Sequence, residues 1–163
     1  METFGIDPSI TREEFFKYKF DVEYSRESIL AGVRNRYIKE MEGEEISDDL
    51  LPGFELIKNW NLRADSLNTS AALSILTLPN AFKPENLKYD RDSITVKLRE
   101  NMSYLKKQYG RIDVPLGRVV RLVRGATSLP LSGGPGTLRA IYSKKGGKNY
   151  KAVAGDCYIQ AVE

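Results

Sequence analysis

The feature that most constrains the fold of this chain is the segment 111–142, which is crowded with glycine and proline. Its short apolar pieces, such as residues 119–122 and 129–131, are separated by these two residue types. Glycine adopts backbone angles that are closed to other residues, and proline fixes φ and lacks an amide hydrogen. The segment therefore predicts a long, shaped connection of non-repetitive backbone. Its leucines and valines argue against disorder, so we expect it to lie along the surface of a larger body.

Helical patterns precede this connection and strand patterns follow it, which predicts an α+β protein with a mainly helical first two-thirds. A β-hairpin is expected at the end, because residues 138–143 and 150–163 read as strands on either side of a glycine turn. The expected helices begin and end near these positions: 12–20, 28–41, 50–61, 71–78 and 93–110.

Several residues mark the ends of these helices. Thr11 and Glu14 have the spacing of a capping box at the start of the first helix. Asp48 or Asp49 is placed to cap the third helix. Gly110 follows the last helical residue and predicts a left-handed stop.

Two strands do not form a stable sheet in water, so the predicted hairpin needs a sheet to join. We therefore expect a helical segment, 1–110, and a segment of irregular connection plus hairpin, 111–163, which together form a fragment of one larger domain. Whether Met1 and Glu163 are natural ends stays open.

Composition excludes several classes of site. The chain has no histidine, which removes Ser-His and Cys-His nucleophilic sites and imidazole zinc sites. Its single cysteine, Cys157, rules out an internal disulfide and leaves the compartment open. The net charge of +3 is too even to argue for nucleic acid by itself, and no apolar run approaches a membrane span.

Three stretches resemble one family: NWNLRADSLNTSAALSIL at 59–76, YGRIDVPLGRVVRLVRGATSLPLSGGPGTLRAIY at 109–142, and AVAGDCYIQAVE at 152–163. KFDVEYS at 19–25 extends the likeness in the same order. Together they resemble the C-terminal part of the β subunit of penicillin-acylase-type N-terminal-nucleophile hydrolases, nearest to the acyl-homoserine-lactone acylases. The order of DVPLG, RLVRG, LPLSGGPGTLRA and GDCYI is the specific part of the likeness.

The resemblance implies a hairpin that belongs to a larger αββα sheet, in an enzyme that hydrolyses a linear amide to a carboxylic acid and an amine. In this family a serine at the free N-terminus of the β subunit attacks the carbonyl, and its own α-amino group is the base. Nothing in this chain matches that serine, so no catalytic, cofactor-binding or metal residue is assigned, and no cofactor is expected. This chain alone is predicted to be inactive.

The partners implied are the remainder of the acylase α and β chains and, through the missing part, an N-acyl small molecule. No nucleic acid or membrane partner is expected. A parent similar to the family would be periplasmic or secreted. The sequence departs from the family pattern at Asn61, Leu116 and Cys157, where Asp, Trp and Ser are usual.

Two motifs could be binding sites for phosphate or nucleic acid, although each also has a structural interpretation. Residues 132–137, SGGPGT, could form a phosphate cradle, but Pro135 removes an amide hydrogen and no Gly-Lys-Ser/Thr ending follows, which favours a packed turn. Arg118, Arg121 and Arg124 recur every third residue and could line a nucleic-acid stripe. The favoured interpretation is solvent-facing or carboxylate-paired arginines.

Other candidates have a structural reading beside the functional one. Asp90 and Asp92 begin like a calcium loop but lack its glycine and distal glutamate, which favours helix capping. Cys157 could be a nucleophile, but its apolar strand favours a packed thiol. An acyl-chain pocket could be lined by Trp60 with Phe54, Leu56 and Ile57, but their helical spacing favours a core face.

The sequence therefore predicts a structural segment of an amidohydrolase. The alternative is a free-standing interaction module that pairs with a partner through an exposed C-terminal strand edge. The acyl chain length, the amine and the oligomeric state stay open.

Overall fold

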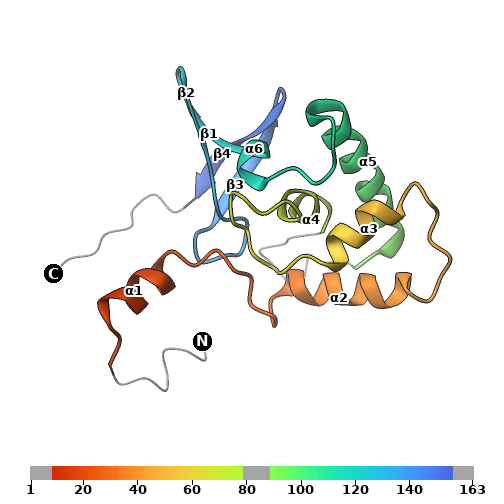
Figure 1. Ribbon diagram of the computed structural model, residues 1–163, viewed down its shortest axis with the longest axis horizontal. Coiled ribbons are helices and arrows are strands. Elements are labelled where there is room, and N and C mark those ends of the chain that lie inside the picture. The colour runs from red at the N-terminus through yellow and green to blue at the C-terminus, as the bar shows by residue number, and fades with distance from the viewer. Residues whose placement is uncertain (1–8, 79–88, 156–163) are drawn as a thin grey trace.

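The computed structural model describes residues 9–78 and 89–155, and these residues form an α+β fold (Figure 1). Six helices and a four-stranded mixed sheet are present in this part of the chain. In order they are α1 (Arg12–Lys19), α2 (Ile29–Met41), α3 (Leu51–Lys58), α4 (Ala71–Thr77), α5 (Arg91–Tyr109), α6 (Leu116–Val119), β1 (Val120–Arg124), β2 (Thr127–Pro130), β3 (Ile141–Gly146) and β4 (Asn149–Gly155).

The predicted caps of the first and longest helices are confirmed. Thr11 accepts from the Glu14 amide while the Glu14 carboxylate accepts from the Thr11 amide, which completes the capping box of α1. Asp90 accepts from the Asp92 amide at 3.1 Å at the start of α5, and Gly110 ends that helix with φ of 79°. Local sequence is enough to place these ends, because each cap acts within one turn.

The predicted aspartate cap of α3 is wrong. Leu50 is the N-cap and makes no side-chain cap hydrogen bond. The amides of Leu50 and Leu51 both donate to the Ser47 carbonyl, at 2.9 and 3.0 Å, so a backbone turn leads into the helix. Asp49 faces outward, where it pairs with Arg99 at 3.4 Å.

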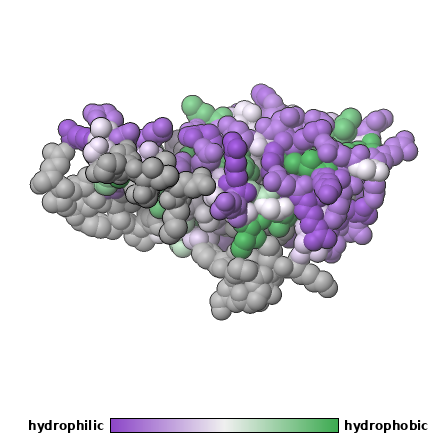
Figure 2. All heavy atoms as spheres, turned by 90° about the horizontal axis from the view of Figure 1, so that it is seen from below, coloured by the Kyte–Doolittle hydropathy of each residue, from purple (hydrophilic) through white to green (hydrophobic). Residues whose placement is uncertain are grey.

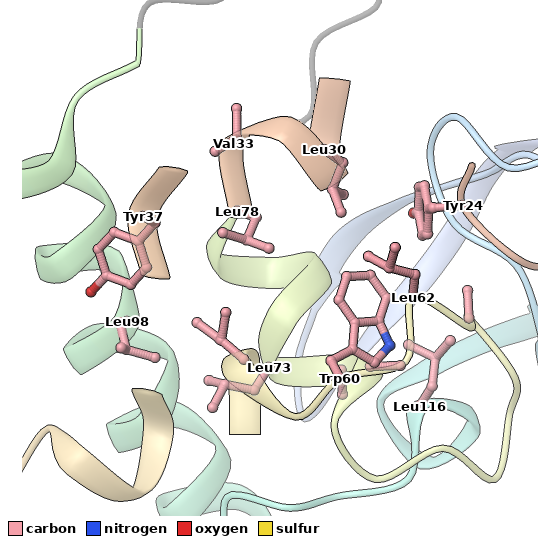
Figure 3. Packing of buried hydrophobic residues seen from close by; sticks show 14 of the residues in the cluster. Tyr24, Leu30, Val33, Tyr37, Trp60, Leu62, Leu73, Leu78, Leu98 and Leu116 are labelled. Atoms are coloured by element: carbon pink, nitrogen blue, oxygen red, sulfur yellow. The ribbon is translucent and has the colours of Figure 1, made fainter. Parts of the chain in front are cut away.

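Helices α2 to α5 and α6 enclose one hydrophobic core, with Trp60 near its centre (Figure 3). Trp60 is 2% exposed, and its indole nitrogen donates to the Arg63 carbonyl at 3.0 Å. Tyr24 meets the indole edge-on with ring centroids 5.6 Å apart. The core therefore joins segments that are distant in sequence around one aromatic centre.

Helix α1 differs from the others because it buries none of its side chains. It lies apart from the helical core, beyond the lower end of the sheet (Figure 1). Phe15 and Phe20 are 42% and 44% exposed, and the rings of Phe16 and Phe20 stack 6.0 Å apart. Its aromatic side chains thus remain on the surface of the described structure.

The expectation of wholly non-repetitive backbone over 111–142 is wrong, because residues 116–130 contain α6, β1 and β2. β1 and β2 form an antiparallel hairpin whose turn begins at Gly125, with φ of 56°. The two strands have only five and four residues, which is too short for their alternation to stand out among the glycines and prolines.

The sheet has the strand order β2-β1-β4-β3. The predicted C-terminal hairpin is confirmed as the antiparallel pair β3 and β4. The expectation that the chain brings only this pair is wrong, because β1 pairs in parallel with β4 at Val120–Tyr150 and Arg121–Lys151. Residues 156–163 of the predicted last strand, including Cys157, lie outside the described residues.

The surface seen from below in Figure 2 is largely hydrophilic in its described part, with hydrophobic residues in small separate groups. Among the described helices, none combines the length and apolar character needed to cross a bilayer.

Candidate functional site

Two of the segments that carry the family resemblance, 59–76 and 109–142, meet in the structure and are joined mainly through their backbones. The Gly133 amide donates to the Ala64 carbonyl at 2.7 Å, and the Gly117 amide donates to the Ser66 carbonyl at 2.8 Å. The Ser66 amide in turn donates to Ser132 Oγ at 2.9 Å. The motif residues therefore satisfy one another's hydrogen bonds, and these polar groups are occupied within the fold.

Two glycines of these motifs stand where chain segments approach closely. A Cβ on Gly134 would lie 2.3 Å from the Tyr24 hydroxyl oxygen, and a Cβ on Gly117 would lie 2.8 Å from Pro130 Cβ. Such separations are too short for carbon and its neighbours. These two glycines therefore serve packing between segments.

Residues 132–137 form a packed turn with its polar groups turned inward. The Gly134 amide donates to Thr137 Oγ1 at 3.1 Å, and the Thr137 side chain is buried beside the Gly134 and Arg139 carbonyls. Because the Gly133 amide is also used, no array of free amides is available for phosphate. The packed-turn interpretation is confirmed.

The candidate acyl pocket is part of the core. Phe54 and Trp60 are each 2% exposed, Ile57 is fully buried, and Leu56 packs partly buried against the same cluster. All four belong to one hydrophobic cluster, in which Trp60 lies among Leu62, Leu73 and Leu116 (Figure 3). The core-face interpretation is confirmed.

Asp90 and Asp92 lie at the start of α5, where Asp90 caps the helix. Within residues 9–78 and 89–155, no group of three or more acidic or sulfur ligands could hold a metal ion. Cys157 lies outside the described residues, so the packed-thiol interpretation stays a prediction.

The arginines of the central segment separate into two environments. Arg118 and Arg121 line a cleft of about 240 Å³ together with Lys148 from the β3–β4 turn. The other lining residues are Tyr109, Ser128 and Asn149. Arg124 lies at the exposed end of β1, where its guanidinium donates to the Val123 carbonyl. None of the described residues that line the cleft carries a carboxylate, so three cationic side chains converge on it.

The cleft is built on fixed groups. The Arg121 guanidinium donates to Ser128 Oγ at 2.9 Å, to the Ser128 carbonyl at 2.6 Å and to the Gly117 carbonyl at 3.0 Å. The Tyr109 hydroxyl lies 2.8 Å from Asn149 Oδ1 and 3.0 Å from the Lys148 carbonyl, which ties the β3–β4 turn to α5. Three of the five N–H groups of Arg121 are used, so two remain for a ligand.

Aromatic rings support the cationic side chains. The Lys148 ammonium lies 5.2 Å from the Tyr109 ring centroid, and the Arg118 guanidinium lies 6.0 Å from the same centroid. Tyr104 meets Tyr109 and Tyr150 edge-on, and the Lys145 ammonium lies 4.7 Å over Tyr104. Burial raises the pKa of Tyr109, so its hydroxyl stays protonated as a donor.

A second, larger groove of about 570 Å³ lies between the start of α3, the middle of α5 and residues 111–113. Its charges largely balance. Arg99 pairs with Asp49, and Arg111 pairs with Asp113, which lowers the pKa of the Asp113 carboxyl. These paired charges give the groove no single ligand preference.

Sequence reasoning named Arg118 and Arg121 but missed the cleft, because Lys148 comes from a distant hairpin. A signal was present in the charge distribution. Residues 101–163 carry eleven basic and three acidic side chains, a net charge of +8, whereas residues 1–100 carry fourteen and nineteen, a net charge of −5. The whole-chain value of +3 conceals this separation.

No protein-family model matches this chain, and no curated protein matches it.

Proposed function

We propose that this chain is the C-terminal β-subunit segment of an amidohydrolase of the penicillin-acylase and acyl-homoserine-lactone-acylase type. Its role is structural, and the catalytic serine belongs to a part of the enzyme that this sequence does not include. The observation that carries the proposal is the ordered set of motifs DVPLG, RLVRG and LPLSGGPGTLRA after NWNLRADS.

The packing of these motifs supports a structural role. Their amides and carbonyls are used between segments, as in the bond from Gly133 to Ala64, and their glycines allow close approach, as at Gly134. Residues used in this way specify a fold without supplying a nucleophile or a base. This agrees with a segment that holds the body on which a reactive serine is carried elsewhere.

The exposed aromatic face of α1 offers a place for the rest of such an enzyme. Phe15 and Phe20 are more than two-fifths exposed, and no side chain of α1 is buried. Apolar surface of this kind is stabilised when another body covers it. The sheet face that carries Lys144 and Lys151 is a poor place for the rest of the enzyme to pack with an apolar layer, because such a layer would bury their charges.

The alternative of strand addition at the C-terminal strand has weaker support. Strand β4 pairs with β3 throughout and with β1 at its start, so the edge strands in the described sheet are β2 and β3. β3 carries Lys144 and Lys145, and charged lysines on an edge strand oppose pairing with a further chain.

The proposal is tested on the protein recovered from its natural source with an antibody against this chain. We expect it to be accompanied by, or covalently continuous with, a polypeptide that begins with serine, and to release amine from N-acyl-homoserine lactones. The isolated chain should release none. Hydrolysis by the isolated chain that is lost on replacing one of its own serines would overturn the proposal, as would natural material without amidase activity.

Variants inside this segment give a second test. Because the segment holds no reacting group, a packing variant such as Gly117→Ala should lower the amount of folded enzyme while turnover per titrated active site stays the same. A loss of turnover per titrated site would contradict a purely structural role.

A further inference from the structure

The basic cleft continues into a row of cations across the sheet. Arg121 on β1 is the register partner of Lys151 on β4, and Lys151 is the register partner of Lys144 on β3. Register partners project from the same sheet face, so the three side chains share one face on neighbouring strands about 4.8 Å apart. Arg121 belongs to both features, which makes the cleft and the row one continuous surface.

The described part of the chain that builds this surface, 101–155, is poor in acidic residues. Between residues 101 and 155 the sequence contains one acidic residue, Asp113, which is paired with Arg111. Like charges directly opposite each other on neighbouring strands are destabilising. Arg121 is held by its hydrogen bonds to Ser128 and Gly117, but these bonds do not explain the facing pair Lys144 and Lys151. A bound polyanion would relieve the repulsion of that pair.

The size of the cleft and the surroundings of its tyrosine rings indicate which kind of polyanion it can bind. The cleft lies between the β1–β2 hairpin and the β3–β4 turn, and its volume of about 240 Å³ accommodates a phosphate group but not a duplex. The ring faces of Tyr104 and Tyr109 are occupied by Lys145 and Lys148, so they are not free to stack bases. The surface is thus suited to reading backbone charge without base identity.

We propose that the cleft and the cation row together bind the phosphate backbone of a single-stranded nucleic acid. Arg118, Arg121 and Lys148 hold one phosphate in the cleft, and Lys151 and Lys144 contact the phosphates that follow. This goes beyond the structural role proposed above and departs from the partner prediction that the even whole-chain charge suggested. It does not depend on amidase activity, so the two proposals fail separately.

Salt dependence provides the test. Binding of a fluorescein-labelled oligothymidylate of about 20 nucleotides is measured by fluorescence anisotropy over a range of potassium chloride concentrations. Three phosphate contacts, one in the cleft and two along the row, at about −0.7 each predict a log–log slope of about −2.1, which is about a twentyfold loss of affinity between about 50 and 200 mM salt.

Two double variants locate the surface. Removing the two row contacts in Lys144→Gln/Lys151→Gln should reduce the slope to about −0.7, which is about a threefold loss over the same salt range. Arg118→Gln/Lys148→Gln leaves only Arg121 on the phosphate in the cleft, so it should weaken binding at every salt concentration. The matched control Lys39→Gln/Lys97→Gln removes the same charge from exposed positions on α2 and α5, and should leave the slope unchanged.

Circular dichroism melting shows whether each variant is folded, and either double variant alone is sufficient for the comparison. Absence of binding at the lowest salt would overturn the proposal, and so would a control that weakens binding as much as the surface variants. Competition by poly-glutamate as effective as competition by unlabelled oligothymidylate would overturn the assignment to nucleic acid in favour of an acidic peptide.

Discussion

Gly134 packs so closely against Tyr24 that the site leaves no room for a side chain at position 134. A Cβ at position 134 would lie 2.3 Å from the Tyr24 hydroxyl oxygen and 3.3 Å from Ile75 Cδ1. Tyr24 is 1% exposed and meets Trp60 edge-on, so its ring cannot turn away into solvent. Gly134→Ala therefore forces a shift inside the core.

The expected cost follows from the packing. Inserting a methyl group into a filled core destabilises by about 1–3 kcal/mol, and replacing glycine returns about 0.4–1 kcal/mol through the unfolded chain. The net effect is a loss of about 1–2 kcal/mol, or a fall in Tm of about 2–8 °C for a chain of this length. Tyr24→Phe removes the clashing oxygen, and the next ring atom, Tyr24 Cζ, lies at an ordinary 3.4 Å. The double variant should therefore recover about 1 kcal/mol relative to additivity.

The assay is urea denaturation followed by the fluorescence of Trp60, the single tryptophan and a buried one. Gly32→Ala is the matched control, because nothing lies within 4 Å of its Cβ and the residue is inside α2. It should stabilise the protein by about 0.5–1 kcal/mol. A Gly134→Ala variant as stable as the parent, or effects of Gly134→Ala and Tyr24→Phe that simply add, would refute the reasoning.

Two further predictions concern the ends of α5. Asp90→Ala removes the N-cap and should lower the free energy of unfolding by about 1 kcal/mol. Asp92→Ala, two residues later and inside the first turn, should cost less, and urea denaturation measures both. Burial raises the pKa of Tyr109 above its ordinary value of 10.0, so the stability that its neutral phenol contributes is complete below pH 10.0 and is lost as the pH rises through the raised pKa. Tyr109→Phe should therefore lose stability less steeply above pH 10.0 than the parent does, and equal slopes would contradict this.

Sequence predicted best what short-range chemistry decides. The ends of α5 follow from Asp90 and Gly110, each of which acts on amides or carbonyls within one turn. The start of α3 could not be predicted in this way. The Ser47 carbonyl accepts hydrogen bonds from the amides of Leu50 and Leu51, where an aspartate side chain was expected to cap the helix. A carbonyl is present in every residue, so the residue types do not indicate this turn.

The sheet and the cleft could not be predicted from the sequence for a different reason. β1 pairs with β4 at only two register positions, and nearly thirty residues separate the partners in the sequence. No local sequence pattern therefore predicts this pairing. The cleft needs that same pairing, because it brings Arg118 and Arg121 beside Lys148. The sequence shows that the arginines recur at every third position, but only the tertiary structure shows which of them share a surface.

The residues of this chain divide by what they contribute to its stability. The motif glycines and the core around Trp60 lower the free energy of the folded state, so their presence is explained by folding. The facing pair Lys144 and Lys151 raises it, because like charges lie opposite each other on neighbouring strands. A feature that opposes folding but lies beside a fixed, acid-free cleft is best explained by a ligand that neutralises it. For that reason the basic surface, rather than the conspicuous glycine-rich motif, is where we expect this chain to bind a partner of its own.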